Sequence, residues 1–148
     1  MPMSNDELIA LALKILESRA KYNVQSLSSP QEVKDYLRLK IGGEEREYFY
    51  AVWLDAQNRV IEFEQVSAGT LTQAQVYPRE IIKSALKYNA AAVFLAHNHP
   101  SGYAEPSRAD ENITSQLKKT LSLIDVRLLD HFVISNHEVV SFAERGLL

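Results

Sequence analysis

The chain has 148 residues, of which 46% are hydrophobic and 24% are charged, as expected for one soluble globular domain. It contains no cysteine, which excludes disulfides, thiolate metal sites and a cysteine nucleophile. The net charge of −3 argues against a protein that coats DNA, because such proteins carry a strongly basic surface. Any metal ligand must therefore come from histidine, aspartate or glutamate.

Two helices are predicted at the start of the chain. Ser4 and Glu7 have the spacing of a capping box, and apolar residues then recur at helical intervals, which predicts a helix over residues 5–20. Ser29 repeats the start signal as an N-cap, with proline at the first helical position, and predicts a second helix over residues 30–39. The pair of glycines after this stretch ends the second helix.

The remaining residues alternate between strand and helix patterns. An aromatic and β-branched run is followed by a turn and an alternating run, which together predict a hairpin. A later, nearly continuous apolar run over residues 90–96 is typical of a strand buried on both faces. The predicted strands span residues 47–54, 60–67, 90–96, 126–135 and 139–142, and helices begin at 77–80 and 107–110.

We therefore predict an α/β fold, a mixed sheet of the α+β kind with flanking helices. Residues 1–44 would form an N-terminal helical extension, and residues 45–148 the main domain. The N-terminus is acidic and no apolar run approaches the ~20 residues that cross a membrane, so neither a signal peptide nor a membrane segment is expected. The expected location is the cytoplasm.

The segment between residues 97 and 110 has the pattern of a metal site. His97 and His99 are two residues apart at the end of the buried strand, so both imidazoles can point to the same side. The intervening segment is rich in proline and glycine and folds the chain back, which would bring Asp110, in the next helix, to the same point. Two imidazoles and one carboxylate make three protein ligands, the number typical of catalytic zinc.

The same segment resembles a known family. The pattern His-x-His-Pro, six residues, Ser, two residues, Asp is similar to the metal signature of the JAMM (MPN+) metallopeptidases. The longer form, over residues 97–110, resembles the RadC-like branch of that superfamily, and short matches at 69–71, 78–80, 89–92 and 129–132 agree with it. The resemblance covers roughly residues 45–146 and implies a cytidine-deaminase-like JAB/MPN fold with zinc as cofactor. Asn98 stands where the peptidase branch usually has serine or threonine.

The resemblance also implies a glutamate that acts as general base on zinc-bound water. Glu47, at the start of the first strand, is the favoured candidate. Glu44 and Glu45, just before the strand, and Glu62 and Glu64, on the second strand, remain alternatives.

Ser107 has two predicted roles. By the resemblance it stabilises the oxyanion of the reaction, and by its position it is the N-cap of the helix that carries Asp110. Of the other polar residues, His131 matches a RadC-like position as a supporting residue or a buried histidine, and Asp130 is a candidate to orient a ligand histidine. His137, in a predicted turn, is expected at the surface.

Three functions follow from these observations. The favoured one is a zinc-dependent hydrolase, a metallopeptidase or isopeptidase, with a peptide or protein substrate. The alternative is a RadC-family protein of DNA repair or recombination, but the acidic balance and the lack of a helix-hairpin-helix pattern before residue 45 weaken a DNA partner. The third is a non-catalytic interaction module, and pairing of the chain with a second copy stays open.

Overall fold

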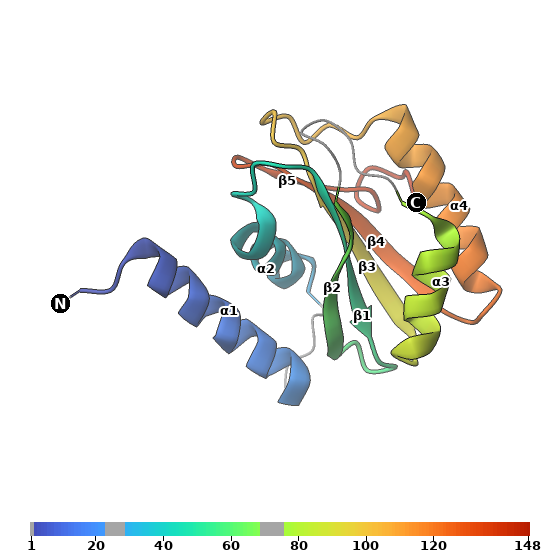
Figure 1. Ribbon diagram of the computed structural model, residues 1–148, viewed down its shortest axis with the longest axis horizontal. Coiled ribbons are helices and arrows are strands. Elements are labelled where there is room, and N and C mark those ends of the chain that lie inside the picture. The colour runs from blue at the N-terminus through green and yellow to red at the C-terminus, as the bar shows by residue number, and fades with distance from the viewer. Residues whose placement is uncertain (1, 23–28, 69–75) are drawn as a thin grey trace.

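The computed structural model describes residues 2–22, 29–68 and 76–148 and has the predicted order of elements (Figure 1). The match at residues 69–71 lies outside the described residues. The helices are α1 (Asn5–Tyr22), α2 (Pro30–Ile41), α3 (Pro78–Lys87) and α4 (Arg108–Ser122). The strands are β1 (Tyr48–Leu54), β2 (Val60–Ala68), β3 (Ala92–Asn98), β4 (Arg127–Ile134) and β5 (Val139–Ser141).

The strands form one mixed sheet in the order β2-β1-β3-β4-β5. β1 and β2 make the predicted antiparallel hairpin, and β1 also pairs antiparallel with β3. β3 and β4 are parallel, so the chain must cross over between them, and α4 makes that crossover. The sheet and its helices confirm the predicted mixed α/β fold.

Helices cover both faces of the sheet, α1 and α2 on one side and α3 and α4 on the other (Figure 1). On the α2 side, Tyr36 and Leu37 pack against β-strand residues such as Val52, so α2 shares one hydrophobic core with the sheet. On the α4 side, Leu117 and Leu121 pack against Trp53 and its neighbours. Within the described ranges, no helix is both long enough and apolar enough to cross a membrane.

Successive side chains of β3 point to opposite faces of the sheet, and this alternation determines which face each of its last residues meets. Phe94 and Ala96 belong to the core on the α2 side, whereas Val93 and Leu95 belong to the core on the α4 side. Continuing the alternation, His97 faces the α4 side and Asn98 the α2 side. One strand end therefore presents polar groups to both faces of the sheet.

One local prediction was wrong and another holds only in part. The buried strand was predicted to end at residue 96, but β3 runs on through His97, which pairs with β1 and β4, and Asn98, which pairs with β4. Both side chains look loop-like in sequence but are buried against polar partners. Ser29 occupies the N-cap position of α2, but its side chain makes no capping hydrogen bond. The capping box of Ser4 and Glu7 at α1 is confirmed.

Candidate metal centre

The two histidines of the predicted site meet at the carboxyl end of β3. His97 is buried at 1% exposure, and the Nε2 atoms of His97 and His99 lie 3.0 Å apart. A turn follows at once, because the Gly102 N–H donates to the His99 carbonyl at 3.1 Å. Gly102 has a φ of 93°, a left-handed conformation that favours glycine. The turn sends the chain back toward the first turn of α4.

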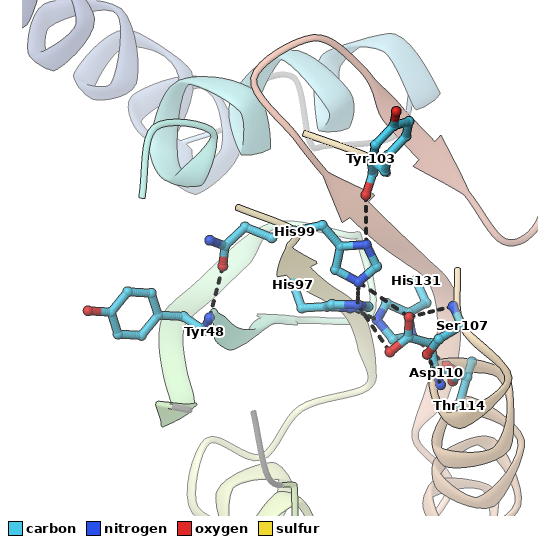
Figure 2. Close-up of polar contacts among 9 residues, drawn as sticks. Tyr48, His97, His99, Tyr103, Ser107, Asp110, Thr114 and His131 are labelled. Carbon is cyan, nitrogen blue, oxygen red and sulfur yellow. Dashed lines mark hydrogen bonds and ion pairs between the residues drawn. The ribbon is translucent and has the colours of Figure 1, made fainter. Parts of the chain in front are cut away.

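Asp110 reaches the histidines from that first turn. The Ser107 hydroxyl accepts the Asp110 N–H at 3.0 Å, and the Asp110 carboxylate accepts the Ser107 N–H at 2.8 Å, so the two residues form a capping box. The predicted N-cap role of Ser107 is confirmed. The carboxylate oxygens of Asp110 lie 3.2 Å from Nε2 of His97 and 3.4 Å from Nε2 of His99. The structure thus brings the three predicted ligands together (Figure 2).

Glu47 lies beside the same cluster. It directly precedes β1 and is 8% exposed, and its carboxylate and the ligand nitrogens of His97 and His99 are all within 4.8 Å of one another. The four alternative glutamates are placed differently. Glu44, Glu45 and Glu62 are exposed, and Glu64 accepts hydrogen bonds from the Trp53 indole at 3.1 Å and the Tyr88 hydroxyl at 3.4 Å.

Asn98 holds the backbone on either side of Glu47. Its side-chain oxygen accepts the Tyr48 N–H, and its amide nitrogen donates to the Arg46 carbonyl. Asn98 had no predicted role beyond its departure from the peptidase pattern. A signal for such a role was present in the sequence. A strand predicted to be buried is followed directly by an asparagine, and a buried amide requires hydrogen-bond partners.

A second group of polar residues lies behind His97. Nε2 of His131 is 2.8 Å from Nδ1 of His97, and Nδ1 of His131 is 2.5 Å from the Thr114 hydroxyl (Figure 2). Thr114 is buried on α4, and sequence reasoning missed it because nothing in its local pattern distinguishes it from a helix core residue. His131 is the histidine for which a supporting position was predicted.

Asp130 and His137 are placed away from the ligand rings. The Asp130 carboxylate accepts hydrogen bonds from the His131 backbone N–H at 2.7 Å, the Ala143 N–H at 2.9 Å and the Ser141 hydroxyl. It therefore ties β4 to the chain after β5, and the group that contacts a ligand ring is the neighbouring His131. His137 is exposed, as predicted.

The electrostatics of the cluster favour a positive charge between the three predicted ligands. Burial alone raises the pKa of Asp110, but hydrogen bonds with His97 and His99 outweigh burial and hold this pKa well below its ordinary value. For His99, burial lowers the pKa, but contacts with the Asp110 carboxylate and the Tyr103 carbonyl raise it above its ordinary value. An ionised carboxylate therefore faces two imidazoles, an arrangement that attracts a proton or a metal cation.

The contacts of His99 also define its orientation. Nδ1 of His99 is 2.8 Å from the Tyr103 carbonyl oxygen, which can only accept a hydrogen bond. Nδ1 therefore carries a hydrogen and donates it, and in the neutral ring Nε2 presents its lone pair to the cluster. This hydrogen bond to a carbonyl is the usual support for a histidine that binds a metal.

The chain is similar to known proteins over most of its length. The profile of the RadC-like JAB domain matches residues 27–147. A UPF0758 protein of Nitrosomonas eutropha is 61% identical over 122 residues, which are 82% of this chain and 54% of the relative. One of Leptothrix cholodnii is 63% identical over 120 residues, 81% of this chain and 54% of the relative.

A UPF0758 protein of Methylibium petroleiphilum is 54% identical over 149 residues, 99% of this chain and 67% of the relative. The chain spans about half the length of the first two relatives, at 54% of each. The profile match covers most of the chain and includes His97, His99, Asp110 and His131. The resemblance found in the sequence is thereby confirmed: the chain belongs to the family of RadC-like JAB domains.

Proposed function

We propose that the chain is a zinc-dependent hydrolase that cleaves a peptide or isopeptide bond. The observation that carries the proposal is the convergence of two imidazoles and the Asp110 carboxylate, with the largely buried carboxylate of Glu47 beside them. JAB domains as a family include hydrolases, which supports the same assignment.

The donor atoms fit zinc in kind and in spacing. Imidazole nitrogen and carboxylate oxygen are ordinary zinc ligands, bound at about 2.0–2.2 Å, and a tetrahedron of that size has neighbouring ligand atoms about 3.3 Å apart. The separations of 3.0, 3.2 and 3.4 Å between the donor atoms of His97, His99 and Asp110 agree with that value. Three protein ligands leave the fourth position for water, as in catalytic sites.

Two carboxylates, those of Asp110 and Glu47, lie beside the histidine pair. The two oxygens of Asp110 lie 3.2 Å from Nε2 of His97 and 3.4 Å from Nε2 of His99, and Asp110 occupies the ligand position of the metal signature that the sequence resembles. Asp110 is therefore assigned as the third ligand. Glu47 lies within 4.8 Å of the ligand nitrogens of both histidines, close enough to act as a base on a water held at the fourth position.

The residues of the chain then have separate tasks. A zinc ion, when bound, lowers the pKa of a coordinated water to about 7 and polarises a carbonyl. Glu47 accepts the proton of the attacking water and passes it to the leaving amine. The Ser107 hydroxyl accepts the Asp110 N–H but still carries its own hydrogen, which it donates to the developing oxyanion.

Metal analysis with two variants tests this proposal. Protein purified without chelators is expected to hold about one zinc per chain, and His97→Ala is expected to lose it. Glu47→Gln keeps the size of the side chain but removes the base, so it is expected to retain zinc and lose cleavage of an internally quenched peptide library. A native chain that binds no zinc refutes the site, and full turnover in Glu47→Gln refutes the assignment of the base.

A further inference from the structure

His131 lies next to His97 in the interior of the molecule. It is on β4, the parallel neighbour of β3, and it is fully buried at 0% exposure. Its ring stacks on Phe142 with centroids 4.6 Å apart and meets Phe49 edge-on at 5.4 Å. Phe49 also stacks on the His97 ring at 5.8 Å. The aromatic rings fix the planes of both imidazoles, so the nitrogen atoms of His131 have defined partners.

The partner of Nδ1 of His131 is the hydroxyl of Thr114 on α4. The Thr114 hydroxyl donates to the Asp110 carbonyl at 2.6 Å, because a carbonyl oxygen can only accept. Its hydrogen is committed there, so in the contact of 2.5 Å with Nδ1 of His131 the hydroxyl oxygen accepts and Nδ1 donates. The hydroxyl of Thr114 thus places a hydrogen on Nδ1 of His131.

The tautomer of His131 in turn determines the tautomer of His97. The nitrogens of His131 reach a hydroxyl and an imidazole, neither of which is an anion, and a buried ring with such neighbours is neutral because an uncompensated buried charge is costly. With its hydrogen on Nδ1, His131 has a lone pair on Nε2, 2.8 Å from Nδ1 of His97. Nδ1 of His97 therefore donates, and the lone pair of Nε2 faces His99 and Asp110.

We propose that Thr114 and His131 are positioning residues that hold His97 in the tautomer able to bind metal. This inference rests on the proposed metal site and adds the residues that prepare one of its ligands. We call the chain of hydrogen bonds from Thr114 through His131 to His97 the relay. Asp110 contributes two groups, because its carboxylate faces the proposed metal position and its backbone carbonyl accepts the hydrogen bond of the Thr114 hydroxyl. Without the Thr114 hydroxyl, His131 is able to reverse its hydrogen, and Nε2–H would then force the opposite tautomer on His97.

The test uses three threonine variants that differ in one group. Thr114→Val keeps the shape of the side chain and removes the hydroxyl, whereas Thr114→Ser restores it. Thr120→Val is the matched control, because the Thr120 hydroxyl also donates to a carbonyl one turn back on α4, that of Gln116 at 2.8 Å. Zinc affinity is measured by competition with a chromophoric chelator, under conditions in which circular dichroism shows each variant folded.

Zinc binding of Thr114→Val is expected to weaken by about 10–100-fold, the usual effect of removing a group that supports a metal ligand. Thr114→Ser and Thr120→Val are expected to stay close to the native affinity. A Thr114→Val protein with native affinity overturns the proposal, since a role in packing alone would lower stability without changing zinc binding by the folded chain.

Nitrogen-15 NMR of the zinc-free native chain gives a second, independent test. Long-range correlation spectra distinguish the two histidine tautomers, and His97 and His131 are both expected to carry their hydrogen on Nδ1. A ring of either histidine without its hydrogen on Nδ1 overturns the relay, even if Thr114→Val does not fold. If the native chain binds no zinc, the proposed function fails, but this spectrum still decides whether the relay exists.

Discussion

The side-chain oxygen of Asn98 accepts a hydrogen bond of 2.9 Å from the backbone N–H of Tyr48, and its amide nitrogen donates to the Arg46 carbonyl at 2.7 Å. Glu47 lies between these two peptide groups. Asn98 points to the α2 face of the sheet, whereas Glu47 approaches the histidines of the opposite face. One amide therefore determines the position of the backbone from which the proposed base extends.

Replacing Asn98 by alanine is expected to disturb the position of the proposed base but not the proposed metal ligands. Loss of a buried acceptor and donor is expected to lower the free energy of unfolding by about 1–3 kcal/mol, measured by urea denaturation. Hydrogen exchange of the Tyr48 amide is expected to accelerate, while zinc affinity stays within a few-fold of native because no ligand is removed. Asn112→Ala, at an exposed position of α4, serves as control. A loss of zinc as complete as in His97→Ala would contradict this separation.

Ser107 and Asp110 share a capping box, but replacing Ser107 is expected to lower stability whereas replacing Asp110 is expected to abolish zinc binding. Ser107→Ala removes the acceptor for the Asp110 N–H and is expected to lower the free energy of unfolding by about 1 kcal/mol, with zinc retained. Asp110→Asn keeps an oxygen that accepts the Ser107 N–H but removes the charge, so it is expected to lose zinc at a small cost in stability. Urea denaturation and zinc content of both variants decide. Native zinc content in Asp110→Asn would instead indicate Glu47 as the third ligand.

Asp130 is predicted to make stability depend on pH in the acidic range. Burial raises its pKa above the ordinary value of 3.8, although hydrogen bonds from Ser141, Ala143 and His131 partly offset burial. Its contribution to stability is therefore complete below pH 3.8 and is lost as the pH rises through the folded pKa. Asp130→Asn stays neutral, so its stability relative to the native chain is expected to rise between pH 3 and pH 7.

Asp130→Ala provides the contrast to that variant. It leaves the donors of Ser141, Ala143 and His131 without their acceptor and is expected to destabilise by about 2 kcal/mol or more at either pH. Urea denaturation at both ends of the pH range measures the two variants side by side. An Asp130→Asn chain whose stability falls relative to native as the pH rises would contradict the predicted sign.

Two buried tyrosines predict loss of stability in alkali. Burial, together with the nearby Glu17 carboxylate, raises the pKa of Tyr36, and burial raises the pKa of Tyr50 to about 12. Because unfolded tyrosine ionises near pH 10, the stability that these residues contribute is complete below that pH and is lost as the pH rises through the folded pKa. The free energy of unfolding is expected to fall above about pH 10.

Tyr36→Phe is expected to make that fall shallower by about 1.4 kcal/mol per pH unit, the effect of one proton fewer. Tyr103→Phe, at a side chain that is 78% exposed, is the control and should follow the native profile. Urea midpoints between pH 8 and pH 11 measure both. An unchanged slope in Tyr36→Phe would show that another group causes the alkaline transition.

The sequence was sufficient where the determining contacts are local. His97 and His99 alternate on one strand, and Ser107 and Asp110 are three residues apart at a helix start, so spacing alone places each pair. The choice among five glutamates needed the fold, since only burial and distance separate Glu47 from the others.

The supporting residues were less accessible to prediction. His131 meets His97 through the parallel register of β3 and β4, which includes a shift between Val93 and Phe94 that no local pattern reveals. Thr114 joins them from α4, and its hydroxyl has a role only because that helix crosses over this pair of strands. Contacts of this kind depend on pairing between distant segments, which hydrophobic periodicity does not encode.

The crossover of α4 between the parallel strands β3 and β4 has a consequence for the order in which the molecule assembles. The proposed ligands and the proposed base come from the start of β1, the end of β3 and the first turn of α4, so they meet only after distant segments have paired. Complete apolar cores already lie on both faces of the sheet. In contrast to small zinc domains that are unfolded without metal, this chain is expected to fold first and take up its ion afterwards. A chelator is then expected to remove the proposed zinc ion and the activity that depends on it, while the chain stays folded and able to bind zinc again.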